Sequence, residues 1–277
     1  MRRTTTPGAA RGNGPGPEGW RSGLREPLPT RVEGLPALPA AYGETLDAGL
    51  EALGETLPPG VRTRLDDHVR LLLAWNAAIN LTAIDEPAAV AREHVLDSLA
   101  ALPLLRAAGA DRLLDLGSGG GFPGLPLAVA LPAHRALLID STAKKTRFLA
   151  TVTAALGLDP GVAVAAARAE ALARDPRHRG RWPVVVARAV APLAELVELG
   201  LPLLARGGLL LAWKRVPLEA ELARAVAALR ALGGGPPQLE PVAVAGLEDH
   251  RLVRIVRVGP VPAGFPRDPA ARRRRPW

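Results

Sequence analysis

The segment from Leu113 to Leu125, LLDLGSGGGFPGL, has the composition of a ligand-binding loop. A short apolar run ends at Leu116, glycines follow at 117, 119, 120 and 121, and an apolar stretch begins after Pro123. This order is typical of a strand, a tight loop and a helix. Because glycine lacks Cβ, such a loop can take positive φ and approach a ligand closely, with helix amides and dipole facing it. The segment therefore predicts a nucleotide-type cofactor site.

Two ligands fit the glycine spacing. Starting where the strand ends, Asp115-x-Gly117-x-Gly119-x-Gly121 is the acidic and glycine pattern of S-adenosylmethionine (SAM) sites. The segment from Gly119 to Gly124 also satisfies the dinucleotide fingerprint GxGxxG. That second register starts past the strand and places Pro123, which has no amide, against a pyrophosphate. We therefore favour SAM, with a glycine turn that binds nothing as the remaining alternative.

A second apolar run, RALLID, ends in Asp140, roughly 20 residues beyond the first glycine, where an acid reaches ribose hydroxyls. The alternative is that Asp140, Ser141 or Thr142 caps the next helix.

The carboxyl half alternates strands and helices, which predicts a mostly parallel sheet covered on both faces. The last two strands lack an intervening helix, so we expect the final one to run antiparallel. Seven strands with this ending outline an α/β class I SAM-dependent methyltransferase fold, Rossmann-like, with an N-terminal helical cap. The expected strands beyond Asp140 are 162–167, 184–188, 209–213, 242–245 and 252–258, and the expected helices are 125–131, 144–156, 193–204 and 218–232.

Leucine stripes predict helices ahead of the first strand, through Leu46 to Leu57 and Leu65 to Ile79, with a third from about Pro87 to Leu105. We expect a methyltransferase domain over residues 41–259, divided into a helical cap (41–110) and a SAM-binding core (111–259). Both tails, 1–40 and 260–277, are rich in Arg, Pro and Gly and are expected to be disordered.

Several linked motifs resemble one family. They are Trp75-Asn76 with Asn80-Leu81-Thr82, His94-x-Leu96-Asp97-Ser98, DLGSGGGFPG, and Asp140-Ser141 with Lys144-Lys145 and Arg147-Phe148-Leu149. The chain from about Leu46 to Val258 looks like the ribosomal RNA small subunit methyltransferase G family (RsmG, GidB). That resemblance implies transfer of a methyl group from SAM to N7 of a guanine in the decoding region of 16S rRNA.

The resemblance also implies cofactor contacts. Gly117 and Phe122 would flank the methionine and sulfonium end, Asp140, Ser141 and Thr142 the ribose, and Ala169 with Glu170 the adenine, while Arg188 would border the site. Glu170 could instead be an ordinary helix-start carboxylate. Arg188 ends a buried strand and needs a partner there. The chain departs from the family at Gly120 and at Lys214-Arg215, where we expect local loop shape to differ.

The residues also constrain the chemistry. The chain has no cysteine, which excludes methylation of pyrimidine carbon 5 through a thiolate adduct. After Arg188 it reads Ala-Val-Ala-Pro, not the Asp/Asn-Pro-Pro-aromatic loop typical of exocyclic amine methylation. Guanine N7 has an in-plane lone pair and needs no deprotonation, so we expect alignment and water exclusion to suffice. No general base is predicted, and the catalytic residues stay unassigned.

Composition favours a soluble cytoplasmic enzyme, expected to be a monomer with no metal site and no membrane association. No apolar run reaches about 18 residues, the amino terminus lacks a signal core, and the histidines lack ligand spacing.

Residues 1–35 carry six Arg and three Glu (+3), and residues 260–277 five Arg and one Asp (+4), out of a total of +8. With only three Lys among 35 basic residues, the arginines could reflect RNA contact or compositional bias.

The predicted partner is 16S rRNA or the small ribosomal subunit. Three other functions stay open at this point. They are a small-molecule methyltransferase of the same fold, an NAD(P)-binding oxidoreductase, and a non-catalytic RNA-binding module that keeps SAM as a structural ligand. Titration with SAM would distinguish a methyltransferase from the oxidoreductase. The identity of the methyl acceptor would distinguish the remaining functions from one another.

Overall fold

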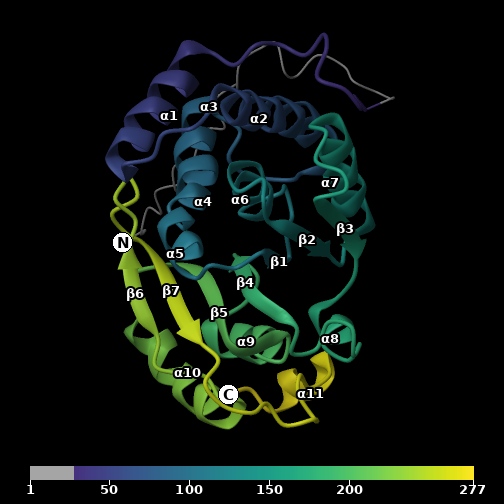
Figure 1. The fold of residues 1–277 in the computed structure, drawn as a ribbon, viewed down its shortest axis with the longest axis vertical. Coiled ribbons are helices and arrows are strands. Elements are labelled where there is room, and N and C mark those ends of the chain that lie inside the picture. The colour runs from purple at the N-terminus through teal and green to yellow at the C-terminus, as the bar shows by residue number, and fades with distance from the viewer. Residues whose placement is uncertain (1–27) are drawn as a thin grey trace, which may run out of the picture.

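The computed structural model describes residues 28–277, in which seven strands form one sheet with helices on both faces (Figure 1). The cap and first strand comprise α1 (Ala40–Leu53), α2 (Pro59–Ile79), α3 (Pro87–Val90), the π-helix η2 (Ala91–Leu96), α4 (Asp97–Leu99), α5 (Leu102–Ala107) and β1 (Arg112–Leu116). Then follow α6 (Gly124–Ala130), β2 (Arg135–Asp140), α7 (Ala143–Ala155), β3 (Val162–Ala166), α8 (Ala169–Leu172), β4 (Trp182–Arg188) and α9 (Leu193–Gly200). The chain continues through β5 (Leu204–Arg215), α10 (Glu219–Leu232), β6 (Gln238–Pro241), β7 (His250–Val256) and α11 (Pro269–Arg274).

The strand order is β3-β2-β1-β4-β5-β7-β6. Strand β1 pairs in parallel with both β2 and β4, whereas β7 runs antiparallel to β5. This confirms the predicted mostly parallel sheet with a reversed last strand. The order changes direction between β1 and β4, and ligands of open α/β sheets bind beyond the carboxyl ends of the strands at such a switch point.

Alternate residues of each central strand face opposite cores, as the pleat requires. In β4, Val184 and Val186 contribute to the core under α2, α6 and α7, and Val185 to the core under α9 and α10. Leu46 of α1 and Leu65 of α2 are buried in the first of these cores. The amino-terminal helices therefore cover the sheet and share its core.

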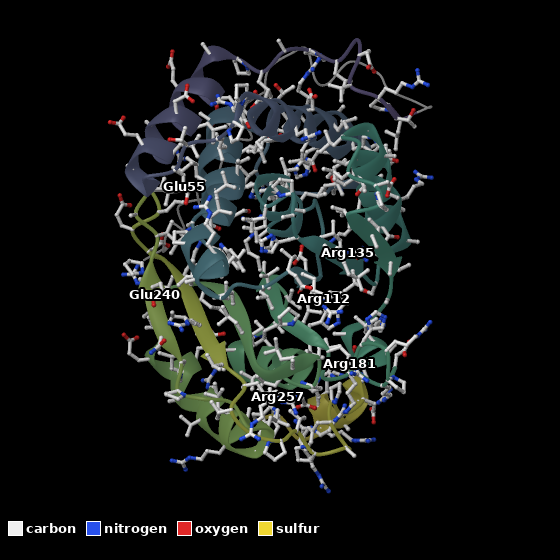
Figure 2. All side chains as sticks on the ribbon, viewed as in Figure 1. Glu55, Arg112, Arg135, Arg181, Glu240 and Arg257 are labelled. Carbon is white, nitrogen blue, oxygen red and sulfur yellow. The ribbon has the colours of Figure 1, made fainter. Side chains whose placement is uncertain are left out.

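The amino end of the sheet carries exposed arginines, labelled in Figure 2. Arg112 and Arg135 begin β1 and β2 and lie opposite each other in the register. Arg112 Nη2 donates to the Arg181 carbonyl, 3.1 Å away, just before β4. This charged edge is the opposite end of the sheet from the glycine loop, which follows the carboxyl end of β1.

The predicted sixth strand at 242–245 is wrong. The strand there is Gln238–Pro241, a mostly exposed edge strand that pairs only with β7. Val242 and Val244 are buried against the cap side of the sheet without belonging to a strand. An edge strand can contain proline and polar residues, so apolar patterning does not reveal it. The helix expected over 193–204 also ends early, at Gly200, since Leu204 already begins β5.

Neither tail matches the expected disorder in its described part. Leu28, Val32, Leu35 and Leu38 pack on the main core, and Trp75 Nε1 donates to the Pro29 carbonyl at 2.8 Å. The prediction for residues 1–27 lies outside the described residues. The segment 260–277 contains α11, whose Arg272 is buried. Disorder was the wrong expectation for this segment because carboxylates elsewhere in the fold bind two of its arginines, Arg267 through Glu198 and Arg272 through Glu170. Within residues 28–277, no helix combines the length and hydropathy needed to cross a membrane.

Candidate active site

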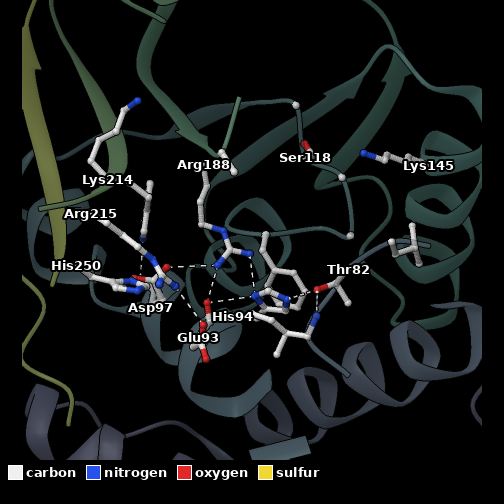
Figure 3. A pocket seen from close by; sticks show the side chains of 18 residues that line it. Thr82, Glu93, His94, Asp97, Ser118, Lys145, Arg188, Lys214, Arg215 and His250 are labelled. Carbon is white, nitrogen blue, oxygen red and sulfur yellow. Dashed lines mark hydrogen bonds and ion pairs between the residues drawn. The ribbon is translucent and has the colours of Figure 1, made fainter. Parts of the chain in front are cut away.

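A cleft of about 500 Å³ opens beyond the carboxyl ends of β1, β4 and β5 (Figure 3). Three predicted site residues, Gly117, Phe122 and Arg188, line it. The other lining residues come from the cap, the glycine loop, α7, the end of β4, β5 and β7: Leu81, Thr82, Ile84, Glu93, His94, Asp97, Ser118, Gly119, Gly120, Lys145, Ala189, Trp213, Lys214, Arg215 and His250. The cleft therefore lies where the strand order predicts a ligand.

The backbone of the loop requires glycine. Gly117, Gly119 and Gly121 have φ values of +71°, +55° and +94°, in the left-handed region that other residues rarely adopt. A Cβ on Gly117 would lie 2.8 Å from Val190 Cγ2, so this position also needs the space. The glycine pattern read from the sequence thus has its expected physical cause.

The loop amides, however, do not face a ligand as the sequence suggested. Gly117 and Ser118 both donate to the Ile139 carbonyl, at 2.8 and 2.9 Å. The remaining donors with internal acceptors are Gly119 to Asp140 Oδ2, Gly121 and Phe122 to the Ser118 carbonyl, Gly124 to Asp115 Oδ2, and Leu125 to the Gly121 carbonyl. Pro123 has no amide. A pyrophosphate would therefore find few free donors here, which disfavours a dinucleotide.

Asp140 joins the loop to the start of α7. Its Oδ2 accepts from the Gly119 amide at 3.1 Å and its Oδ1 from the Thr142 amide at 2.8 Å. Each carboxylate oxygen has two lone pairs, so acceptor capacity remains for hydroxyl groups. The Thr142 side chain makes no capping hydrogen bond to α7, and both Ser141 and Thr142 are exposed.

Arg188 has the partners that its burial demands. Its Nη1 donates to the Glu93 carbonyl at 2.7 Å and lies 3.3 Å from Asp97 Oδ2. Its Nη2 lies 3.1 Å from His94 Nδ1, and its guanidinium carbon lies 5.4 Å from the Phe122 ring centroid. Main-chain, carboxylate, imidazole and aromatic groups thus fix the guanidinium at the cleft wall.

His94 is neutral in this network. Burial, followed by the neighbouring Arg188 charge, lowers the pKa of His94 to about 3. His94 Nδ1 lies 3.1 Å from both Arg188 Nη2 and the Glu93 carbonyl oxygen, and Nε2 lies 2.7 Å from Thr82 Oγ1. Both ring nitrogens are therefore occupied, which argues against a role for His94 as a base.

Asp97 connects the π-helical segment to strands β5 and β7. Its Oδ1 accepts from His250 Nδ1 at 2.9 Å, and its main-chain carbonyl accepts from Trp213 Nε1 at 2.8 Å. The sequence analysis missed His250 and Trp213. A usable signal existed: β7 is antiparallel, so its first residue lies at the same edge as the last residues of β5.

The π-helix η2 lies just before Asp97 and contains Glu93 and His94. A single wide turn of this kind is often found at functional sites. The packing here depends on Gly49 of α1, because a Cβ at this position would overlap the Leu96 side chain. The small residue lets α1 approach η2 closely.

Phe122 lies between two histidine rings. Its centroid is 4.6 Å from that of His68 and 4.7 Å from that of His94. Burial lowers the pKa of His68 to about 4, so its ring is neutral, and its Nε2 donates to the Gly120 carbonyl at 2.9 Å. The sequence analysis gave His68 no role, although its contacts fix both the loop and Phe122.

Asp115, beneath the loop, is a buried carboxyl group. Burial raises its pKa to about 7, and Oδ1 has no hydrogen-bond partner in the described structure. Its Oδ2 accepts from the Gly124 amide at 3.0 Å. Asp115 therefore anchors the start of α6 and does not line the cleft.

Ala169 and Glu170 do not line this cleft. They begin α8 after β3, whose end is joined to the site by the Ala167 amide, 3.1 Å from the Asp140 carbonyl. The Glu170 carboxylate is buried and bound by Arg272. Its side chain is thus committed to another partner.

The strand order, the reversed last strand and the glycine loop at the switch point define a class I SAM-dependent methyltransferase. The chain belongs to the rRNA small subunit methyltransferase G family, whose GidB model matches residues 62–242. The protein named "Ribosomal RNA small subunit methyltransferase G" from Roseiflexus castenholzii is 46% identical over 71% of this chain and 83% of its own length. The protein of the same name from Pelotomaculum thermopropionicum is 37% identical over 86% of this chain and 99% of its own length.

Proposed function

We propose that this chain transfers the methyl group of SAM to N7 of a guanine in 16S rRNA of the small ribosomal subunit. The observation that carries the proposal is the cleft in which the glycine loop, Phe122 and Arg188 meet. Membership of the family, whose members are named for rRNA methylation, supports the same substrate.

The residues present fit SAM better than a dinucleotide. Most amides of the glycine loop are hydrogen-bonded to acceptors within the protein, and SAM carries no phosphate that would require them. A Cβ on Gly119 would meet nothing nearer than the Gly117 carbonyl at 3.8 Å, so open space adjoins the loop. Gly117 and Phe122 would hold the methionine end, Asp140, Ser141 and Thr142 the ribose, and Ala169 with Glu170 the adenine, with Arg188 at the border.

When bound, SAM supplies a methyl carbon made electrophilic by the positive sulfur. The chain's own residues then need to align the acceptor and exclude water. Guanine N7 attacks with a lone pair and releases no proton, so no base is required. This agrees with His94, which is neutral and has both nitrogens occupied. Arg188 and Phe122 would form the wall that orients the target base.

Basic groups at the rim suit an RNA substrate. Lys145, Lys214 and Arg215 all line the cleft, and because Lys214 is held by Glu221, Lys145 and Arg215 are the groups that would contact phosphates. We propose that the chain acts as a monomer in the cytoplasm, where the ribosomal subunits are located.

The test is transfer of labelled methyl from SAM to isolated 30S subunits, to naked 16S rRNA and to free guanosine nucleotides, with cleavage at 7-methylguanosine to map the base. We expect label at one guanine of 16S rRNA. Label on another base, or on small molecules as efficiently as on rRNA, would contradict the proposed substrate. Failure to bind SAM in calorimetry would reject the methyltransferase itself.

A further inference from the structure

We propose that Arg272 of α11 is a positioning residue for the cofactor site, acting through Glu170. The idea rests on the proposed function, because it takes the start of α8 as the adenine contact. Residues 260–277 lie outside the 62–242 match to the family model, so the family resemblance gives them no role.

Arg272 is buried beneath the start of α8 and α9. Its Nη2 binds Glu170 Oε1, its Nε donates to Glu195 Oε1 at 3.0 Å, and its Nη1 donates to the Arg267 carbonyl at 2.7 Å. The side chains of Arg272 and Glu170 are each only 9% exposed. Charges buried to this degree are stable only when paired, so each depends on the other.

The segment around α11 is itself fixed at both ends. Before the helix, Arg267 Nη2 pairs with the fully buried Glu198 at 2.6 Å. After it, Trp277 Nε1 donates to the same carboxylate at 2.6 Å and the indole stacks on Phe265, with centroids 5.8 Å apart. Asp268 accepts from the Ala271 amide and caps α11. Arg272 therefore reaches Glu170 from a firmly attached segment.

The effect of this ion pair can reach the cofactor because it acts on the first turn of α8, whereas the end of α8 is held separately by Leu172 and Ala173, which are buried in the core with α9. Helix α8 has only four residues and follows directly on β3, whose end is bound to Asp140 through the Ala167 amide. Holding the Glu170 carboxylate on the α11 side keeps that side chain out of the adenine position. The backbone at Ala169 and Glu170 then stays in one place beside the ribose contacts.

The experiment measures SAM and adenosine affinity by calorimetry on the full chain. The variants are Arg272→Met, Arg272→Lys, Glu170→Gln and the double variant Arg272→Met/Glu170→Gln, with Arg273→Met as the exposed neighbour control. We expect Arg272→Met to weaken SAM binding by about five- to tenfold, within the usual range of coupling between sites. Adenosine should weaken by the same factor, because the adenine half is affected, and Arg272→Lys should recover part of the loss.

Because Arg272 acts through Glu170, the double variant should bind SAM no more weakly than the poorer single variant. Unchanged SAM affinity in Arg272→Met and Glu170→Gln would overturn the proposal. So would additive losses, or a loss for SAM with none for adenosine. If Arg272→Met fails to fold, the Lys and Gln variants give the same comparison. A wild type that does not bind SAM would instead reject the proposed function.

Discussion

Arg188 Nη2 lies 3.1 Å from His94 Nδ1, so a residue that ends β4 fixes an imidazole of the π-helical segment in the cap. Nη1 of the same guanidinium lies 3.3 Å from Asp97 Oδ2, and the Asp97 side chain is only 2% exposed. Cap and sheet are therefore connected through buried charge at the cleft, and this connection can be tested.

Arg188→Met should lower both stability and methyl transfer. Removing one member of a buried pair costs about 3–5 kcal/mol, and we expect the lower end because Asp97 retains His250. Denaturant unfolding measures the free energy, and single-turnover transfer measures the activity. The control is Arg177→Met, which breaks an exposed pair with Asp175. Equal stability of the two variants would contradict the importance of the buried network.

Gly117→Ala should weaken SAM binding more than backbone strain alone explains. Both Gly117 (φ +71°) and Gly109 (φ +57°) are left-handed, so alanine costs about 1–2 kcal/mol of stability at either. Only at Gly117 would the new Cβ approach Val190, because Gly109 has nothing within 4 Å. Calorimetry should show weaker SAM binding for Gly117→Ala and wild-type binding for Gly109→Ala. Matching affinities would place the cofactor elsewhere.

Wild type and His94→Gln should give parallel pH profiles for single-turnover methyl transfer over roughly pH 6.5–8.5. The pKa of His94 is about 3, because burial and Arg188 disfavour its charged form, so it does not titrate in this window. The variant's overall rate can fall without a change in profile shape. A one-proton rise in the wild type that disappears in His94→Gln would restore a general base.

Asp115→Asn should change how stability depends on pH. Burial raises the folded pKa of Asp115 from 3.8 to about 7, so between these values the folded state binds the proton and the unfolded state does not. The stabilisation from this group is complete below pH 3.8 and lost as pH rises through 7. Relative to Asp115→Asn, wild type should lose about 1.4 kcal/mol per pH unit within that window. Urea unfolding at pH 5 and 8 checks this, and a constant difference would contradict the raised pKa.

Replacing Arg273, Arg274 and Arg275 with Gln should reduce the salt dependence of RNA binding. These side chains are exposed at the end of α11, whereas Arg272 stays in place to hold that helix. Each lost phosphate contact should reduce the slope of log affinity against log salt by about 0.7 for single-stranded RNA. The matched control replaces Arg112, Arg135 and Arg181 at the amino end of the sheet, the end away from the glycine loop (Figure 2). Equal slopes in wild type and both triple variants would indicate compositional bias at Arg273–Arg275.

Local sequence was sufficient for much of the fold. The glycine loop, the alternation of strands and helices and the reversed last strand are confirmed, since each depends on backbone constraints or apolar periodicity within a short segment. The same reasoning failed at β6, where an edge position relaxes the apolar pattern, and at α11, where composition suggested disorder. Both failures concern segments whose structure depends on distant partners.

The residues of the candidate site also fall into those indicated by the sequence and those found only in the structure. Sequence by itself indicated Gly117, Phe122 and Arg188, the glycine from the local loop pattern and all three from the motifs that carry the family resemblance, and these residues line the cleft. Only the tertiary structure decided that Arg188 meets His94, 94 positions away, and that Arg272 meets Glu170, 102 positions away. A buried charged side chain is stable only when it is paired. The local sequence shows that such a side chain is buried but does not show which residue pairs with it. Which carboxylate or imidazole does so is set by how helices and strands pack around it.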